Sequence, residues 1–510
     1  MLLYLFLVVY FLILFTVFIY SSHRYYMVYL YYKHQKDKPV LKKKLDKLPH
    51  VTVQLPIYNE MYVTRRLIKA SCEIDYPREL LEIQVLDDST DETAAVARKC
   101  VEEHREKGFD IQYIHRENRE GYKGGALSNG LKTAKGEFVA VFDADFVPQK
   151  DMLQKTIHFF EDKSVGMVQC RWSYLNRSYS FLTKIQAIML DGHFVIEHTA
   201  RNWSGRFFNF NGTAGVWRKT AIETAGGWQN DTLTEDLDLS YRSQLKGWKF
   251  IYLKDELSPS EIPVEINGFK GQQHRWAKGS IQTAKKLLPQ ILKSKLPLKV
   301  KVEAFFHLTN NISYLLMLVL SVLIYPSMVA RINIGWFQMI ITDVPFLLFA
   351  TVGISFFYTC SQKEAYKNWK SRVIYLPMLM SLGIGLSVNN SKAVLEAIFN
   401  RQTAFKRTPK YSIEEKKDSW LGKKYRGEIN FLVILELLLG IYFSFNIYFA
   451  FVNKIYVSIP FLMIFQMGYF YVAFLSIFQV ILNVITSNRL ARHFISKRNT
   501  EDVIAAQGEY

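Results

Sequence analysis

Three patterns of hydrophobic and polar positions follow one another along the chain, and each predicts a different kind of element. Residues 2–20 form an uncharged apolar run that is long enough to cross a bilayer as a helix. Residues 51–270 alternate short apolar runs with stretches of helical periodicity, which predicts a parallel α/β sheet. Four later apolar runs are further candidate spans: residues 305–330, 340–360, 431–452 and 455–485.

The residues around the first apolar run predict how the chain is oriented. No basic residue precedes the run and no small-residue cleavage site follows it, which argues against a cleaved signal peptide. Basic residues are instead concentrated in residues 22–50, directly after it. Because basic residues favour the cytosolic side, we expect an integral cell membrane protein with its amino terminus outside and its α/β domain in the cytosol.

Residues 373–388 decide how many spans are expected. The segment is apolar, but it is short for a span and contains Pro377, Gly383 and Gly385. If it crossed, the basic stretch 392–426 and the basic tail would both lie outside. An interfacial or re-entrant helix keeps both in the cytosol, so about five membrane-spanning helices are expected.

The expected order of segments follows from these runs. It is a membrane helix (1–21), a basic cytosolic linker (22–50), an α/β domain (51–270), a polar motif with an amphipathic interfacial helix over 281–298 (271–303), two spans (304–360), an interfacial helix with a basic loop (361–429), two further spans (430–486) and a cytosolic tail (487–510).

Composition narrows the classes of function. The net charge is +18, but no basic helix or RNA-binding motif accompanies it, so nucleic acid is not expected as a partner. The basic residues lie largely beside the apolar runs, as they do in membrane proteins. The four cysteines lie far apart without a Cys-x-x-Cys pair, which argues against a disulfide framework or a cysteine zinc site.

Polar clusters follow three of the predicted strands. Asn59-Glu60 comes after the strand 51–57, Asp87-Asp88 after 81–86, and Asp143-Ala-Asp145 after 138–142. Ligands of open α/β sheets bind beyond the carboxyl ends of the strands, so the three clusters predict one site. Asp-x-Asp offers oxygen ligands to a hard divalent cation, although isolated Asp-x-Asp pairs are also common on surfaces.

Two glycine-containing stretches predict close approach to a ligand. Residues 119–126 (Arg-Glu-Gly-Tyr-Lys-Gly-Gly-Ala) precede a predicted helix and would supply glycine amides and Lys123 to an anion. They lack the Walker Gly-Lys-Ser/Thr ending, which argues against a P-loop ATPase. Residues 208–215 (Phe-Asn-Phe-Asn-Gly-Thr-Ala-Gly) give the backbone freedom to approach a ligand, although a simple glycine turn explains them equally well.

Thr234-Glu235-Asp236 is the centre of the candidate chemistry. The apolar positions of residues 230–245 recur every four residues, which predicts a helix. Thr232 and Glu235 match a capping box, which places both carboxylates in the first turn. Acidic residues favour a helix N-terminus in any protein, but the neighbouring acidic clusters indicate a general base.

The order of these motifs resembles that of inverting family 2 glycosyltransferases of the cellulose synthase superfamily. The motifs are Asp87-Asp88, Asp143-Ala-Asp145, Thr234-Glu235-Asp236 and Gln272-x-x-Arg275-Trp276. The surrounding residues are most similar to cellulose-synthase-like glucomannan (mannan) synthases, and the resemblance covers roughly residues 50–410. It implies a GT-A domain, which is a doubly wound, Rossmann-like α/β fold.

The resemblance also implies roles for individual residues. Asp236 with Glu235 would be catalytic, Asp143 and Asp145 would hold Mg2+ or Mn2+, and Arg275 would clamp the pyrophosphate. The implied nucleotide-sugar-binding residues are Pro56, Asn59, Glu60, Asp87, Asp88, Lys123, Asp143, Gln272 and Arg275. The implied acceptor-binding residues are Trp276, Asn211, Gly212 and Thr213, with Trp276 stacking on a sugar.

A basic segment beyond the α/β domain resembles the Phe-x-Val-Thr-x-Lys gating loop of cellulose synthases. It contains Phe405, Thr408 and Lys410, but Arg407 replaces the valine. The alternative is a solvated basic loop, which is common for runs of charge.

The expected activity is processive, inverting synthesis of a β-linked polysaccharide, either a mannan or glucomannan or a glucan, from GDP-mannose or UDP-glucose. One alternative is a non-processive lipid glycosyltransferase of the ceramide glucosyltransferase type, which product size would distinguish. A second is a non-catalytic nucleotide-sugar sensor. The sequence leaves the sugar, the base, the linkage and the oligomeric state open.

Overall fold

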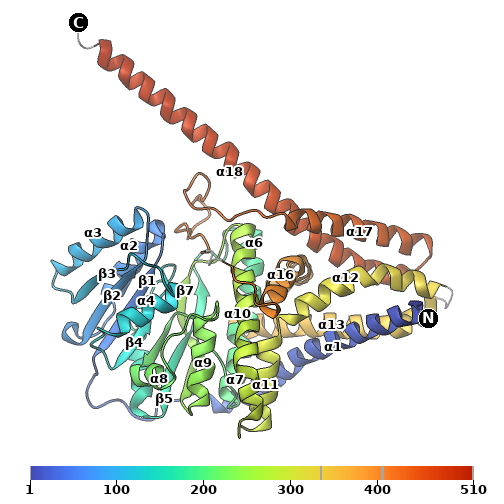
Figure 1. The fold of residues 1–510 in the computed structure, drawn as a ribbon, viewed down its shortest axis with the longest axis horizontal. Helices are drawn as coiled ribbons and strands as arrows, with labels where there is room; N and C mark the ends of the chain where they lie inside the picture. Colours follow the sequence, from blue (N-terminus) through green and yellow to red (C-terminus); the bar gives the residue numbers. More distant parts are fainter. Residues whose placement is uncertain (1, 333–335, 404–406, 508–510) are drawn as a thin grey trace.

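The structure is a computed structural model that describes residues 2–332, 336–403 and 407–507. An α/β domain occupies one side of the molecule, and most of the long helices lie on the opposite side (Figure 1). The first helix, α1 (Leu2–Lys33), runs alongside α12 (Ile312–Arg331) and α13 (Trp336–Ala365). Elements from both ends of the chain therefore form one helical body beside the α/β domain.

Seven strands form the central sheet in the order β3-β2-β1-β4-β6-β5-β7. Their bounds are β1 (Val51–Ile57), β2 (Leu81–Asp87), β3 (Ile111–His115), β4 (Phe138–Val141), β5 (Val165–Tyr174), β6 (Gly215–Arg218) and β7 (Lys249–Ser260). β1 to β4 are mutually parallel, and the positions of β1, β2 and β4 agree with the predicted strands. β6 lies antiparallel between β4 and β5, so the expected all-parallel sheet is corrected to a mixed one. This mixed sheet between helices is GT-A-like and confirms the expected α/β fold class.

Helices cover both faces of the sheet. On one face, α2 (Met61–Cys72) and α3 (Thr93–Arg105) pack with Val51, Val53 and Leu55 of β1 in one hydrophobic core. A second core on the other face includes residues of α4 (Tyr122–Leu131) and α9 (Glu235–Leu245). Because both faces are covered, the strand ends are the part of the sheet from which polar side chains can reach a ligand.

The shorter helices connect these elements. They are α5 (Met152–Thr156), α6 (Phe181–Asp191), a π-helix (Gly192–Glu197), α7 (His198–Trp203), α8 (Lys219–Thr224), α14 (Lys370–Val373) and the 3-10 turns Gln35–Asp37, Arg78–Leu80, Ile157–Glu161 and Tyr456–Ser458. The remaining long helices are α10 (Ile266–Lys293), α11 (Leu298–Thr309), α15 (Leu376–Gly385), α16 (Ser387–Ile398), α17 (Leu432–Val452) and α18 (Ile459–Gln507).

Five helices of the described chain are long and apolar enough to cross a membrane, as expected from the sequence. They are Leu5–Lys33, Ile312–Arg331, Pro345–Ala365, Leu432–Val452 and Tyr456–Ser487. The segment that contains residues 373–388 is a bent pair, Lys370–Gly385 and Ser387–Ile398, with an angle of 42° between its helices. Such a bend is compatible with a broken span or with a re-entrant loop.

Three predicted boundaries are corrected. The helix expected to end near residue 21 continues to Lys33, so the basic linker begins inside α1. The run 305–330 is divided between α11 and α12. The interfacial helix expected over 281–298 is not separate, because α10 runs without a break from Ile266 to Lys293 and ends before Pro297.

Candidate active site

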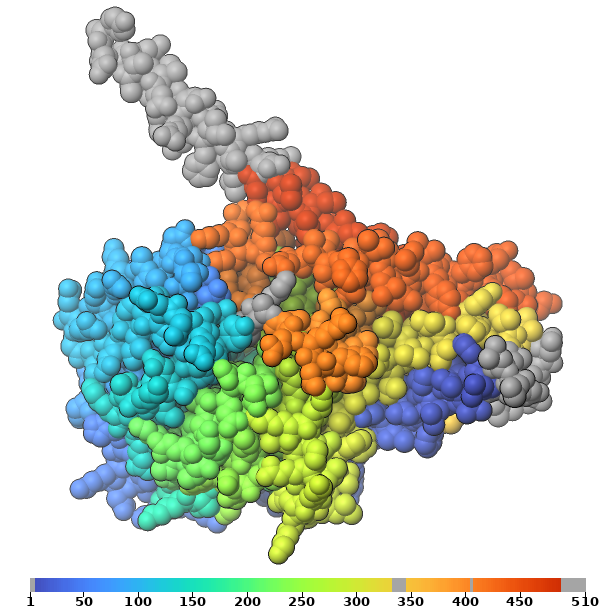
Figure 2. Space-filling model, viewed as in Figure 1, coloured from blue at the N-terminus to red at the C-terminus, as the bar shows by residue number. Residues whose placement is uncertain are grey.

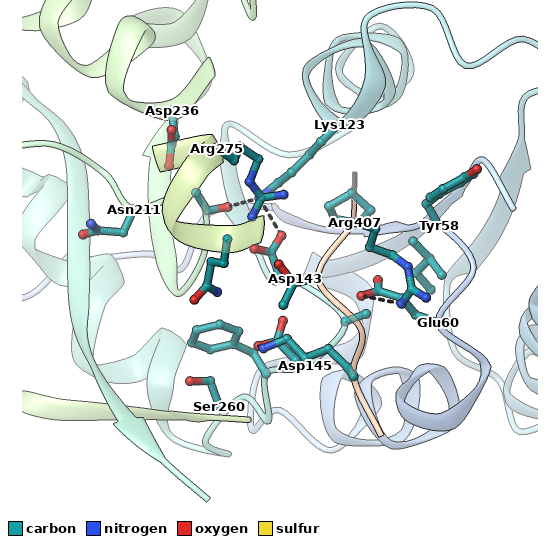
Figure 3. A pocket seen from close by; sticks show the side chains of 18 of the residues that line it. Tyr58, Glu60, Lys123, Asp143, Asp145, Asn211, Asp236, Ser260, Arg275 and Arg407 are labelled. Carbon is teal, nitrogen blue, oxygen red and sulfur yellow. Dashed lines mark hydrogen bonds and ion pairs between the residues drawn. The ribbon is translucent and has the colours of Figure 1, made fainter. Parts of the chain in front are cut away.

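A cleft lies at the carboxyl ends of β1, β2 and β4, between α9, α10 and residues 407–410 (Figure 3). It contains about 1190 Å³ of space between atoms, a volume that includes open solvent. Fifteen predicted site residues line it: Pro56, Glu60, Asp88, Lys123, Asp143, Asp145, Asn211, Gly212, Glu235, Asp236, Gln272, Arg275, Trp276, Thr408 and Lys410. The fold therefore brings motifs from distant parts of the chain into one cleft.

Three predicted residues lie beside this cleft and support its walls. Asp87 is fully buried and accepts hydrogen bonds from the Tyr113 hydroxyl (2.7 Å) and the Ser89 amide (3.0 Å). The Asn59 side chain accepts a bond from the Thr90 amide (2.9 Å), which joins the ends of β1 and β2. The Thr213 hydroxyl accepts a bond from the Asp143 amide (2.9 Å). Phe405 lies outside the described residues.

Lys123 is the central cation of the cleft. Its Nζ lies 2.5 Å from Asp143 Oδ1 and 3.9 Å from Glu235 Oε1, and it donates to the Gly212 carbonyl at 2.8 Å. Burial alone would lower the pKa of Lys123, but the carboxylates of Asp143 and Glu235 outweigh it and raise the pKa above its usual value. Lys123 therefore stays protonated and can face a diphosphate.

The predicted glycine loop at residues 119–126 is corrected. α4 begins at Tyr122, so Gly124 and Gly125 are helical and the Gly125 amide donates to the Gly121 carbonyl. A Cβ on Gly125 would lie only 2.1 Å from the Glu120 carbonyl oxygen. These glycines permit close packing of α4, and the charged side chains that this stretch presents to the cleft are Arg119 and Lys123.

Asp236 lies in the first turn of α9, as predicted, but the expected capping box is wrong. The N-cap residue is Thr234, without a side-chain capping bond, and Thr232 lies before the helix. Asp236 Oδ1 accepts the Leu237 amide at 2.8 Å. Loss of water in the cleft, and then the nearby charge of Glu235, raise the pKa of Asp236 to about 7. A carboxylate with this pKa can exchange protons near neutral pH.

Gly212 allows the loop before β6 to approach both charged groups. Its φ is +82°, and a Cβ there would lie 3.0 Å from both Asp236 Oδ2 and Lys123 Nζ. The close approach predicted for residues 208–215 thus occurs at Gly212, where only glycine avoids both strain and contact.

Asp143 and Asp145 each pair with a lysine. Asp143 contacts Lys123, and Asp145 Oδ2 lies 2.8 Å from Lys410 Nζ (Figure 3). Burial raises the pKa of Asp143 above its usual value. Within the described chain, no group of three or more histidine, cysteine or acidic side chains is arranged to hold a metal ion. A cation at this place would therefore take two carboxylates from the protein and its other ligands from substrate and water.

Residues 407–410 close one side of the cleft. Lys410 and Thr408 are buried, and Arg407 Nη1 lies 3.5 Å from Glu60 Oε1. The Arg407 guanidinium also lies 4.2 Å from the centre of the Tyr425 ring. Residues 407–410 are therefore packed against the domain, unlike a solvated loop. Arg407, which replaces the valine of the resembled motif, pairs with Glu60.

Burial raises the pKa of Glu60 to about 7, although Arg407 opposes the shift. Near neutral pH the Glu60 carboxyl group is therefore protonated in part of the molecules, and a closer approach of Arg407 would favour its ionised form.

The sequence did not single out several further residues at this site. Arg116 forms two bonds with the Asp88 carboxylate, at 2.7 and 2.5 Å. The Arg119 guanidinium lies 3.3 Å from the centre of the Tyr58 ring, and both residues line the cleft. Arg119 stands within the quoted glycine motif, whereas the pairing of Arg116 with Asp88 had no signal in the sequence.

Residues 49–279 match the family model described as glycosyltransferase like family 2. This stretch is a glycosyltransferase family 2 domain. Glucomannan 4-beta-mannosyltransferase 1 of Oryza sativa subsp. japonica is 42% identical over 268 residues, which cover 52% of this chain and 51% of that protein. Glucomannan 4-beta-mannosyltransferase 2 of Arabidopsis thaliana is 44% identical over 253 residues, covering 48% and 47%. The chain thus spans about half the length of the curated relatives it matches.

Solved structures include a mannosyltransferase from Pyrobaculum calidifontis in complex with GDP-Man and Mn2+. It shares 20% identity and a TM-score of 0.47 over 76% of this chain and 100% of that chain. TarS of S. aureus shares 14% identity and a TM-score of 0.35 over 68% and 55%.

The glycosyltransferase domain includes every strand of the sheet and ends within α10, three residues after Trp276. Residues 407–410 lie beyond this domain but line its cleft. In the space-filling view, the orange segment that continues from them lies against the blue part of the domain (Figure 2). The Tyr425 hydroxyl donates to Asp91 at 2.6 Å in this contact. The cleft is therefore completed by chain that follows the domain.

Proposed function

We propose that this protein is an inverting, processive glycosyltransferase that extends a β-linked polysaccharide from a nucleotide sugar, with mannose as the preferred sugar. The observation that carries the proposal is the placement of Asp236, a carboxylate with a pKa near neutrality, in the same cleft as Lys123, Arg275 and Asp143. The names of the relatives, glucomannan 4-beta-mannosyltransferases, support mannose and a β-linkage.

In this proposal one group of cleft residues acts on the acceptor and another acts on the departing diphosphate. Asp236 takes the proton of the acceptor hydroxyl as that oxygen attacks the anomeric carbon, with inversion. The departing diphosphate gains negative charge, which Lys123 and Arg275 stabilise. Arginine suits this position because its planar fork can pair with two phosphate oxygens. Glu235 sets the charge around the base, and Trp276 offers a flat apolar face to the acceptor sugar.

We further propose that Asp143 and Asp145 hold Mg2+ or Mn2+ together with the donor diphosphate. The donor set fits a hard divalent cation, because it consists of two carboxylates and leaves positions for phosphate oxygens and water. The cation would supply positive charge for the leaving group. Lys410, which pairs with Asp145, would then have to move or share this carboxylate.

The remaining chain fits a polymer product better than a lipid glycoside. α10 carries Gln272, Arg275 and Trp276 and leads through α11 to the membrane helix α12. Thr408 and Lys410 lie on the cleft and would exclude water from the reacting sugar, which suppresses donor hydrolysis. The basic residues beside the spans favour a cytosolic domain and an amino terminus outside.

The test is incubation of the purified full chain with a panel of radiolabelled nucleotide sugars. We expect long, water-insoluble β-linked chains from GDP-mannose, and Asp236→Asn should abolish them while nucleotide binding persists. Label recovered only in a lipid-extractable monoglycoside would favour the lipid glycosyltransferase. Nucleotide binding without any transfer would favour the sensor.

A further inference from the structure

Two histidines lie directly behind the loop that approaches Asp236 and Lys123: His198 is buried and His193 is partly buried. His198 Nε2 lies 2.5 Å from Asn211 Oδ1, and the Asn211 Nδ2 amide lies 3.2 Å from His193 Nε2. The centres of the two imidazole rings are 4.2 Å apart. Asn211 itself lines the cleft (Figure 3). One asparagine side chain is therefore held between two imidazole rings.

The local backbone explains how the two rings meet. His193 and His198 are five residues apart, which on an α-helix would separate them by about 140°. The segment Gly192–Glu197 is instead a π-helix, in which the His198 amide bonds to the His193 carbonyl. The i→i+5 register of a π-helix brings residues five apart to the same side. Insertions of this kind cost helix regularity and often occur at functional sites.

The hydrogen bonds of the pair have a fixed direction. His193 Nδ1 lies 2.9 Å from Glu197 Oε2, and a carboxylate can only accept. His193 therefore donates from Nδ1 and accepts from the Asn211 amide nitrogen at Nε2. This leaves Asn211 Oδ1 to accept from the Nε2 proton of His198. Burial lowers the pKa of His198 to about 3, so the ring is neutral at physiological pH.

The far end of this chain of bonds is anchored. The Glu197 carboxylate also pairs with Arg24 of α1 and lies 3.3 Å from Arg201 Nη1. Arg201 in turn bonds Glu303 of α11 at 2.8 Å. Asn211 is thus fixed to two helices outside the central sheet.

The residues after Asn211 hold three groups of the proposed reaction. The Gly212 carbonyl accepts from Lys123, and Gly212 lies against Asp236. The Thr213 hydroxyl accepts from the Asp143 amide. A movement of this loop would therefore displace the base, the lysine and the first aspartate of Asp-x-Asp together.

We propose that His193 and His198 are positioning residues, which clamp Asn211 and thereby fix the Gly212–Thr213 backbone against Lys123, Asp236 and Asp143. Their effect on transfer rests on the proposed function, whereas the clamp itself can be measured without it. Neither ring needs to contact substrate. The clamp acts through the Gly212–Thr213 backbone, which contacts the proposed base and the groups that face the diphosphate.

The experiment uses the purified full chain with Asn211→Ala, His198→Leu, their double variant and His198→Gln. Amide hydrogen exchange of peptides covering residues 208–214 reports loop opening directly. We expect faster exchange there in both single losses. Transfer should fall about tenfold in kcat, since a lost hydrogen bond of about 1.4 kcal/mol corresponds to that factor. The KM for the donor should change little.

Non-additivity distinguishes a clamp from general damage. The double variant should be no slower than Asn211→Ala, because each change breaks the same link. His198→Gln can still donate to Asn211 Oδ1 and should recover most of the turnover and protection. His104→Leu is the matched control, since His104 is buried and, within the described residues, its ring bonds only Cys100, one turn earlier in the same helix. It should leave residues 208–214 and kcat unchanged.

The outcomes separate the two proposals. Parental exchange at residues 208–214 in both Asn211→Ala and His198→Leu overturns the clamp, and so do additive losses of kcat. If His198→Leu does not fold, Asn211→Ala alone decides, because it removes the shared side chain. A parent that transfers no sugar refutes the proposed function, and the exchange data then still support or overturn the clamp.

Discussion

Glu235→Gln should move the acid limb of the transfer reaction to lower pH. The pKa of Asp236 is about 7 because the cleft removes water from its carboxylate and because Glu235 adds a like charge. Asp143 raises the pKa further, whereas Lys123 lowers it. Glutamine keeps the shape of residue 235 and removes one of the charges that disfavour ionisation. The variant base should therefore lose its proton more easily than the parental one.

The size of the effect follows from the protonation of the base. With a pKa of about 7, about half of Asp236 is ionised at that pH and about a tenth one unit below it. Removing a neighbouring like charge typically changes a pKa by about one unit, or about 1.4 kcal/mol. The relative rate about one unit below neutrality should accordingly rise several-fold in Glu235→Gln. Lys123→Met removes an opposite charge and should move the limb upward.

The assay is kcat/KM for the donor between about pH 5 and pH 9, because this ratio reports the free enzyme. Nucleotide binding at each pH is the control for general damage to the cleft. Equal midpoints for Glu235→Gln and the parent would show that the base does not sense residue 235. An upward shift would refute the assignment of Asp236 as the base, since its sign contradicts the electrostatics.

Four further changes test separate parts of the proposal. Asp145→Ala or a chelator should abolish transfer, and added Mn2+ should restore only the chelated parent; full activity in chelator refutes the metal. Trp276→Ala should shorten the product at least several-fold when the polymer is dissolved and its chain length measured, because acceptor stacking is lost; parental length would refute stacking. Gly279→Ala should slow transfer and lower the unfolding temperature only slightly. Its Cβ would lie 2.5 Å from the Thr234 side chain and should displace the start of α9. A cysteine at the exposed Lys417 should resist an impermeant reagent in intact cells, and labelling would place this segment outside.

The strands and the acidic ends of the sheet could be predicted because their signals are local. β1 and β2 are fully buried strands in which apolar residues recur at alternate positions, and each leads into polar residues that the sheet brings to one edge. The direction of β6 had no such signal. A buried run of four residues is equally apolar in either direction, and its place between β4 and β5 depends on contacts far apart in the sequence.

Predictions of helix boundaries were wrong where a sequence motif had more than one structural explanation. Thr232 and Glu235 have the spacing of a capping box, but α9 begins after Thr234. Gly124 and Gly125 suggested a loop, yet the tight contacts of Gly125 show that glycine here serves helix packing. Residue spacing could not separate these uses, because both place small or polar residues near a helix start.

The clamp around Asn211 illustrates a different limit. The resemblance implied an acceptor role for Asn211, but the sequence did not single out His193 and His198. On an α-helix, residues five apart lie on different faces, so their spacing gave no signal. The π-helical turn changes this geometry and lets one carboxylate, Glu197, determine which way the Asn211 amide faces. The connection between α1 and residues 211–213 thus depends on the π-helical backbone register of Gly192–Glu197. It becomes visible only when the π-helix, residues 211–213 and Arg24 of α1 are placed together.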